Sequence, residues 1–298
     1  MIIDTGIRCL RDPFILVDNG VYYAYGTGVE GEDHMKNTWW TCYKNTSGKL
    51  DGNWVKVEDL AVVPSDASKN RWAPEVHKYK GDFYMFTTYY SSVTEHRGCT
   101  ILKSSSPEGP FVEITNGHIT PHEWDCIDGT LYIDGDGQPW MVFVHEWTCT
   151  DDGIGRMAVA KLSDDFTHLV SEPVELFRAD SPSWTDRRVT DGCFLYTTCD
   201  NKLLMIWSNF ESNGEDYCVG IAHSKNGKVD GEWVQDDELL FSKRTTGKYD
   251  GGHGMIFKDT DGKMYLSVHS PNLPCEEFDE RTILVEIKEE NGTLVCVK

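Results

Sequence analysis

Short apolar and aromatic stretches recur along the chain, and polar turns separate them. Five segments share one layout, in which an acidic residue or a histidine is followed by an apolar stretch, a turn rich in Gly, Asn or Asp, and an aromatic-rich stretch. These segments are residues 12–27, 75–90, 128–144, 191–208 and 253–270. Two strand-like stretches joined by a short turn of this composition are typical of a β-hairpin. The pattern therefore predicts five β-hairpins.

The hairpins recur at a nearly constant spacing, which indicates a repeat architecture. Their leading residues are Asp12, Glu75, Asp128, Asp191 and His253, separated by 63, 53, 63 and 62 positions. A third strand is predicted after each hairpin, beginning near Trp39, Thr100, Met157, Tyr217 and Thr282. We expect an outer fourth strand after it, opening most clearly at residues 52–54, 109–111 and 231–233. Four antiparallel strands repeated five times predict an all-β, five-bladed β-propeller, with residues 1–298 as a single domain and no helix.

The leading residues of the five hairpins are themselves candidates for a functional site. In a propeller the first strand of each blade lies beside the central axis, so residues at equivalent positions form a ring around it. One acidic residue at the start of a strand often only caps a turn. Five ionisable residues at equivalent positions are harder to explain in this way, because crowded carboxylates repel one another. The sequence therefore predicts a site on the axis.

Charge and composition narrow the range of partners. The chain has 28 Lys and Arg against 49 Asp and Glu, which gives a formal net charge of −21. Such a charge repels nucleic acid and anionic membrane surfaces. No apolar run approaches the ~18–20 residues that a membrane helix needs. We therefore expect neither nucleic acid nor a membrane as a partner, while a neutral oligosaccharide or polysaccharide fits, and the oligomeric state stays open.

Cysteine usage bears on the cellular compartment. The ten cysteines form no C-x-x-C pair, and several lie within apolar, strand-like runs. They are predicted to be reduced residues of the core rather than a disulfide framework or a zinc site. The first residues lack the basic and apolar regions of a signal peptide. Both observations favour a cytoplasmic protein; the alternative is a secreted or periplasmic protein from which a signal peptide was removed.

A group of carboxylates in a funnel with aromatic walls suits the hydrolysis of a neutral sugar acetal. Glycoside hydrolysis uses a carboxylate and a carboxylic acid on opposite sides of the anomeric carbon. A separation of roughly 6.5–9.5 Å leaves room for a water molecule and inverts the configuration. A third acidic group can raise the pKa of the acid by repulsion, so that it keeps its proton near neutral pH.

Four short motifs, taken in blade order, resemble glycoside hydrolase family 43. They are R-D-P-F at residues 11–14, W-A-P-E-V at 72–76, D-G-T-L-Y-I-D at 128–134 and G-G-H-G-M at 251–255. The resemblance covers nearly the whole chain. It implies a five-bladed propeller that hydrolyses α-L-arabinofuranosyl linkages of arabinan or arabino-oligosaccharides, or β-xylosides, in plant cell-wall polysaccharides. It also implies inversion at the anomeric carbon.

The resemblance implies roles for three carboxyl groups. Asp12 matches the general base that activates water, and Asp128 matches the residue that tunes the pKa of the acid and orients its partner. The general acid of the family is usually a Glu in a T-E-G-P stretch, whereas this chain has Thr190, Asp191 and Gly192 there. Asp191 is the predicted acid although its side chain is one methylene shorter. Glu146 is the reserve candidate.

The resemblance also implies a metal site and substrate contacts. His253 matches a histidine that holds a hydrated metal ion, often calcium, in many relatives. One calcium ion on the axis and no organic cofactor are therefore expected, unless His253 is a neutral, hydrogen-bonded axial residue. The residues predicted to bind substrate are Glu75, Trp72, His145, Trp147 and Trp124.

Three alternatives stay open at this point. A fructan-acting propeller shares the R-D-P motif, but the nucleophile and acid motifs of that group are absent. A mannoside phosphorylase needs basic residues for phosphate, and only Arg187 and Arg188 offer such a pair. A carbohydrate-binding propeller that has lost catalysis would follow from the unusual Asp191.

Overall fold

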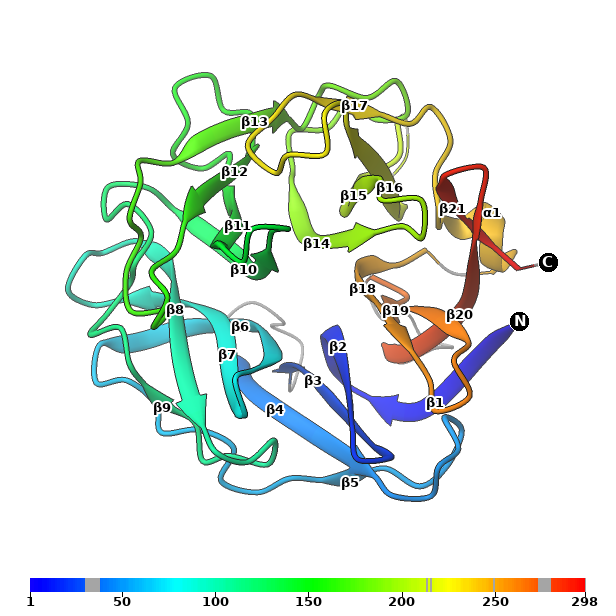
Figure 1. Cartoon of the computed structure of the whole chain (residues 1–298), viewed down its shortest axis with the longest axis horizontal. Helices are drawn as coiled ribbons and strands as arrows, with labels where there is room; N and C mark the ends of the chain where they lie inside the picture. Colours follow the sequence, from blue (N-terminus) through cyan, green and yellow to red (C-terminus); the bar gives the residue numbers. More distant parts are fainter. Residues whose placement is uncertain (30–37, 213, 215, 249, 273–279, 298) are drawn as a thin grey trace.

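The computed structural model describes the whole chain except residues 30–37, 213, 215, 249, 273–279 and 298. The described residues form five antiparallel sheets, arranged as blades around a central axis (Figure 1). The predicted all-β, five-bladed propeller is confirmed. The structure adds one helical turn, α1 (Lys243–Thr246), so the expectation of no helix is wrong for these four residues. No helix in the described part of the chain has the length and apolar character needed to cross a membrane.

The first four blades are meanders in chain order. The first blade contains β2 (Leu10–Asp18), β3 (Val21–Val29), β4 (Thr38–Asn45) and β5 (Val55–Lys56). The second contains β6 (Ala67–Tyr79), β7 (Asp82–Ser91), β8 (Arg97–Ser104) and β9 (Val112–Glu113). The third contains β10 (Cys126–Ile133), β11 (Pro139–His145), β12 (Arg156–Lys161) and β13 (Val174–Arg178). The fourth contains β14 (Asp191–Thr197), β15 (Leu203–Phe210), β16 (Tyr217–Ser224) and β17 (Trp233–Gln235).

The fifth blade joins the two ends of the chain. It contains β18 (Gly252–Lys258), β19 (Met264–Ser270), β20 (Arg281–Glu290), β1 (Ile2–Arg8) and β21 (Thr293–Cys296). Both β1 and β21 pair antiparallel with β20, so the two ends lie beside this blade (Figure 1). The expectation that the fourth strand follows the third is therefore incomplete here, because the start of the chain supplies one. Backbone hydrogen bonds between β1 and β20 close the ring.

The apolar core lies mainly between neighbouring blades. In one cluster Tyr25 of the first blade, Val76 of the second and Met255 of the fifth are buried together. In another, Trp207 of the fourth blade is fully buried with Trp140 of the third. Burying a large apolar side chain contributes about 1.5–3 kcal/mol. The polar atoms of these aromatic residues are paired as well; Tyr25 donates to the Pro107 carbonyl at 2.5 Å. The nine described cysteines are free thiols, and Cys275 lies outside the described residues.

Every inner strand contains a β-bulge at the same place. Its pairing register shifts between Arg11 and Phe14 in β2, and at the matching place in β6, β10, β14 and β18. One residue of each bulge has a positive φ: Asp12 (54°), Ala73 (42°), Asp128 (56°), Gly192 (52°) and His253 (47°). A bulge changes the direction of a side chain and is frequent beside active sites. Left-handed residues other than glycine carry strain, which a functional site can retain.

The bulges correct the predicted ring of equivalent residues. The residues at equivalent positions are Asp12, Ala73, Asp128, Gly192 and His253. Asp191 directly precedes Gly192, the left-handed residue of its blade. Glu75 lies two residues after Ala73, the left-handed residue of its blade. The prediction that all five leading residues are equivalent is therefore wrong for Glu75 and Asp191. Hairpin spacing could not resolve this, because a shift of one residue turns a strand side chain to the other face.

Candidate active site

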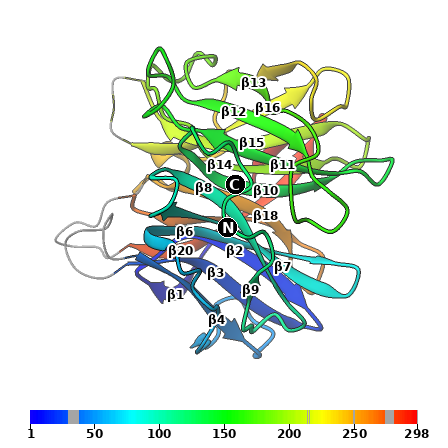
Figure 2. The same cartoon turned by 90° about the vertical axis from the view of Figure 1, so that its left-hand side faces the viewer.

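Three of the predicted residues meet on the axis at the start of the inner strands. The Nδ1 atom of His253 lies 3.2 Å from Asp12 Oδ1 and 3.7 Å from Asp128 Oδ2. The first blade lies across the axis from the third and fourth blades (Figures 1 and 2). Asp12 on β2 and Asp191 on β14 therefore approach the axis from opposite sides. This is the relative placement that a base and an acid need around one sugar.

The left-handed backbone of each bulge is held by the preceding blade. Four bulge N–H groups donate to side chains on the second strand of that blade: Asp12 to His269 Nδ1 (3.3 Å), Ala73 to Thr27 (2.7 Å), Asp128 to Thr88 (3.0 Å) and His253 to Ser208 (2.8 Å). The matching position of the third blade is Val144, which offers no acceptor. There the Gly192 N–H donates to Asp128 Oδ2 at 2.9 Å instead. The break in the repeat therefore connects Asp128 to the strand that carries Asp191.

Asp12 is surrounded by groups that favour its ionised form. Its Oδ2 accepts a hydrogen bond from the Thr27 hydroxyl at 2.6 Å. Burial alone would raise its pKa, but the positive charges of His253 and Arg11 and the Thr27 hydrogen bond hold it below the usual 3.8. Burial and the charge of Arg11 lower the pKa of His269 to about 3, so this ring is neutral and its Nδ1 can accept the Asp12 N–H.

Asp128 and His253 form a buried pair beside Asp12. Burial and the charges of Asp12 and Glu75 raise the pKa of Asp128 to about 6, although His253 and the Gly192 N–H oppose the rise. Burial disfavours the His253 cation, but the surrounding carboxylates, led by Asp12 and Asp128, raise the pKa of His253 above its usual value. Glycine is required at position 192, because a Cβ there would lie 2.7 Å from the His253 ring.

Asp191 has a different environment, in which its one hydrogen-bonding partner among the described residues is a neutral phenol. Its Oδ2 accepts a hydrogen bond from the Tyr217 hydroxyl at 3.0 Å. Burial and the charge of Asp128 raise the pKa of Asp191 to about 7, while His253 and the Tyr217 hydrogen bond lower it less. Near neutral pH a substantial fraction of Asp191 is therefore protonated. A group in this state can donate a proton.

Glu146, the reserve candidate, is tied to an arginine. Its Oε2 accepts from Arg97 Nε at 2.6 Å, and Arg97 also donates to Asp125 at 2.9 Å. Burial raises the pKa of Glu146, against the opposing effect of Arg97. A carboxylate that accepts a charge-assisted hydrogen bond from a guanidinium is stabilised in its ionised form. This arrangement suits a proton donor less well than that of Asp191.

Several of the residues predicted to bind substrate already contact other side chains of the protein. Trp124 and His145 stack face to face, with centroids 3.8 Å apart and an interplanar angle of 3°. His145 is buried, and Trp124 is partly buried against the apolar cluster that contains Phe86 and Phe143. The guanidinium of Arg188 lies 3.9 Å from the centre of the Trp147 ring, and that of Arg97 lies 5.9 Å from the Trp72 ring.

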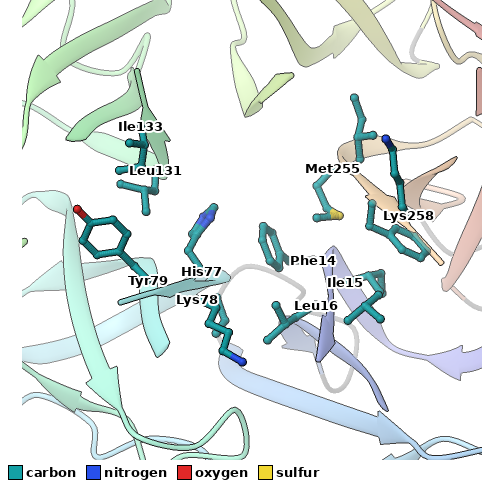
Figure 3. Close-up of a pocket in the computed structure, with 14 residues that line it drawn as sticks. Phe14, Ile15, Leu16, His77, Lys78, Tyr79, Leu131, Ile133, Met255 and Lys258 are labelled. Atoms are coloured by element: carbon teal, nitrogen blue, oxygen red, sulfur yellow. The ribbon is translucent and has the colours of Figure 1, made fainter. Parts of the chain in front are cut away.

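Glu75 lies on β6, two residues after the left-handed Ala73 of the bulge. It is buried, and its Oε2 is 3.2 Å from His77 Nε2. A cavity of about 480 Å³ is lined by His77 and by other later residues of β2, β6, β10 and β18. Phe14 and His77 are among its lining residues, with ring centroids 5.0 Å apart (Figure 3). Glu75 therefore lies on β6 between the bulge and the residues that line this cavity.

Sequence reasoning missed several residues that shape the site. Arg11 donates to Glu280 at 2.5 Å and to the Asn272 carbonyl at 2.7 Å, which anchors the residue next to Asp12. His269 and Tyr217 were not singled out either. Aligned hairpins could have shown His269, because it takes the place of Thr27, Thr88 and Ser208. Tyr217 carried no signal beyond its position at the start of a predicted strand.

The calcium site expected at His253 finds little support in the described residues. Calcium prefers six to eight oxygen ligands. Nδ1 of His253 already contacts two carboxylates, which leaves one ring nitrogen for a metal. Within the described ranges, no group of three or more His, Cys, Asp or Glu side chains is arranged to hold a metal ion. The donor set therefore does not fit a protein-built calcium site, and His253 as a ligand stays a prediction.

Comparisons with solved structures identify proteins of the same fold. The structure is similar to an endo-arabinase of Bacteroides thetaiotaomicron, with 36% identity, a TM-score of 0.81 and coverage of 97% of this chain and 98% of that one. It is also similar to a β-xylosidase/α-arabinofuranosidase from a compost metagenome, described as a calcium-free form (18% identity, TM-score 0.72, 98% and 95% covered).

Sequence comparison gives the same result. The chain is 23% identical over 154 residues to an extracellular endo-α-(1→5)-L-arabinanase of Bacillus subtilis, which covers 47% of this chain and 44% of that protein. The match thus spans less than half the length of that relative. Residues 7–294 match the model of glycosyl hydrolases family 43. The chain therefore belongs to glycosyl hydrolase family 43.

Proposed function

We propose that the protein hydrolyses α-L-arabinofuranosyl linkages of arabinan or arabino-oligosaccharides, with β-xylosides as the second candidate substrate. The observation that carries the proposal is the contrast between Asp12, whose pKa is lowered, and Asp191, whose pKa is raised to about 7. Two carboxyl groups whose environments drive their pKa values apart supply a base and an acid at one pH. Similarity over nearly the full length to a protein described as an endo-arabinase supports arabinan as the substrate class.

The proposed reaction is a single displacement at the anomeric carbon. Asp12 accepts a proton from a water molecule as the water oxygen bonds to this carbon. The glycosidic C–O bond breaks at the same time, and Asp191 donates its proton to the departing oxygen. Asp128 contributes the negative charge that raises the pKa of Asp191, and His253 neutralises part of the charge between Asp12 and Asp128. Attack opposite to the leaving group inverts the configuration.

Substrate binding is assigned to the rim of the funnel. Aromatic rings can stack on the apolar face of a sugar, and we assign this role to Trp72, Trp124 and Trp147. Glu75 and His145 are buried, so we assign them to supporting positions beneath these residues. The alternative of a carbohydrate-binding propeller without catalysis is not favoured, because Asp191 retains an environment suited to proton donation.

The test is product formation from arabinan, arabino-oligosaccharides and xylo-oligosaccharides, with proton NMR of the first anomer released. Inverted product from the wild type and none from Asp191→Asn is the expected result. A retained anomer would contradict the assignment of Asp12 as a base. No product from any substrate, with sugars still raising the melting temperature, would indicate a binding protein.

Two further properties are proposed with less structural detail. A hydrated calcium ion, with His253 as one protein ligand and water as the others, predicts that EDTA lowers activity or melting temperature; no change in either contradicts it. The word extracellular in the name of the Bacillus subtilis relative supports action outside the cell on a polymer. The cytoplasmic alternative, predicted from the sequence, would require imported oligosaccharides. Cell fractionation of the native source distinguishes the two locations.

A further inference from the structure

Tyr217 approaches the proposed acid from the start of β16. Its side chain is buried, and its hydroxyl is 3.0 Å from Asp191 Oδ2. Its ring stacks on His269, with centroids 5.6 Å apart and an interplanar angle of 28°. Gly252 makes this approach possible, because a Cβ at that position would lie 2.6 Å from the Tyr217 ring. Three elements, β16, β18 and β19, therefore fix where this hydroxyl lies.

The hydrogen bond distinguishes the two oxygens of Asp191. Burial and the nearby carboxylates hold the pKa of Tyr217 well above its usual value, so the phenol keeps its proton and acts as the donor. Among the residues that the structure describes, no other group hydrogen-bonds the Asp191 carboxyl group. When Asp191 is protonated, Oδ2 accepts from Tyr217 and the proton resides on Oδ1. Oδ1 is then the atom available to the glycosidic oxygen.

We propose that Tyr217 is a positioning residue for the general acid: it orients the Asp191 carboxyl group and assigns the transferable proton to Oδ1. This inference rests on the proposed function, in which Asp191 is the acid. An aspartate side chain has one rotatable bond fewer than a glutamate. A single hydrogen bond to one oxygen can therefore fix its orientation. Tyr217 also stabilises the carboxylate that remains after proton transfer.

The experiment removes the hydroxyl and varies the leaving group. Tyr217→Phe keeps the ring packing and is assayed on an oligosaccharide and on a dinitrophenyl glycoside of the same sugar. The departing sugar of an oligosaccharide leaves as an alcohol and needs a proton from the acid. Dinitrophenolate is stable as an anion and leaves without a proton. We expect kcat to fall roughly 10- to 100-fold on the oligosaccharide and less than about 3-fold on the aryl glycoside, with little change in KM.

Tyr25→Phe is the matched control. Tyr25 is also fully buried and donates to a backbone carbonyl, but it lies away from the carboxylates. It should change the melting temperature without changing the ratio of the two activities. Gly252→Ala gives a second route if Tyr217→Phe folds poorly, because the added methyl group displaces the Tyr217 ring. The same selective loss on the oligosaccharide is expected.

The outcomes separate this inference from the function on which it rests. An equal loss on both substrates, or no loss on either, overturns the positioning role while the wild-type activity still supports the proposed function. A selective loss on the oligosaccharide supports the role. A wild-type enzyme that cleaves neither arabinosides nor xylosides overturns the proposed function, and the inference with it.

Discussion

The first and fourth blades contain the same kind of β-bulge on the inner strand, but the carboxyl groups beside these bulges have opposite pKa shifts. On the first blade, Asp12 lies next to Arg11, His253 and the Thr27 hydroxyl, which keep it ionised. On the fourth blade, Asp191 is buried near Asp128 with one phenolic hydrogen bond, and the charge of His253 offsets only part of the effect of burial, so the pKa of Asp191 rises to about 7. A propeller thus repeats its strands, while the side chains of neighbouring blades lower the pKa of one carboxyl group and raise that of another.

The difference originates in one position of the repeat. Four blades place a hydrogen-bond acceptor on their second strand, which takes the bulge N–H of the next blade. The third blade has Val144 instead, and Asp128 takes the Gly192 N–H. The carboxylate of Asp128 is therefore drawn to the acid side, where its charge raises the pKa of Asp191. A single apolar residue in a repeated pattern places the third carboxyl group.

Removing the base should have the largest effect. Asp12→Asn keeps the size of the side chain but cannot accept a proton from water, so kcat should fall about 10²–10⁴-fold or more. The loss should be similar for oligosaccharides and activated aryl glycosides, because both need an activated water. Steady-state kinetics measures both. Near-normal turnover by a folded variant would exclude Asp12 as the base.

Removing the acid should give a loss that depends on the leaving group. Asp191→Asn should lower kcat about 10²–10⁴-fold on oligosaccharides and much less on a dinitrophenyl glycoside. Glu146→Gln is the comparison, because Glu146 is already paired with Arg97. If Glu146→Gln shows the selective loss and Asp191→Asn does not, the two assignments must be exchanged.

Removing Arg11, the cation next to Asp12, should lower the free energy of unfolding. Arg11→Met leaves Glu280 without the partner that lies 2.5 Å away, at a cost of about 3–5 kcal/mol in the free energy of unfolding. Burial raises the pKa of Glu280 to about 7, so protonation should reduce this cost at pH 5 relative to pH 8. Urea unfolding at both pH values measures the difference. The double variant Arg11→Met/Glu280→Gln should recover part of it; no recovery would show that the lost packing of Arg11 dominates.

The pH dependence of kcat/KM should reflect the titration of both Asp191 and Asp12. The acid form of Asp191 is lost as pH rises through about 7, so kcat/KM should fall about tenfold per unit above that pH. Asp12 should lose its charge only below its usual pKa of 3.8, which leaves a broad acidic plateau. Asp128 and Asp191 bind protons more tightly when folded, so stability should fall as pH rises from about 4 to 7. A melting temperature that rises over this range would contradict their raised pKa values.

Restoring the missing acceptor should have the smallest effect. Val144→Thr offers a hydroxyl group to the Gly192 N–H, which then competes with Asp128 for this hydrogen bond. Loss of the bond should raise the pKa of Asp128 and lower kcat several-fold, because one hydrogen bond contributes about 1 kcal/mol. Val142→Thr, two residues away on the same face of β11, controls for burying a hydroxyl. Equal effects of the two variants would mean that the Gly192 hydrogen bond does not position Asp128.

The sequence by itself determined the repeat and the chemistry of the axis. Hairpin turns and aromatic strands are local features, so five blades and the residues at their inner edges can be read in order. Asp12, Asp128 and His253 could be aligned because each begins the same short pattern. The family motifs added their roles.

Only the tertiary structure decided how these residues act. A bulge shifts register by one residue, which separated Asp191 and Glu75 from the positions equivalent to Asp12. Closure of the ring by β1 depends on pairing across almost the full length of the chain. The pKa values depend on burial and on charges from other blades, such as Asp128 near Asp191. Tyr217 belongs to no motif, and the space that Gly252 leaves for its ring exists only in the folded chain.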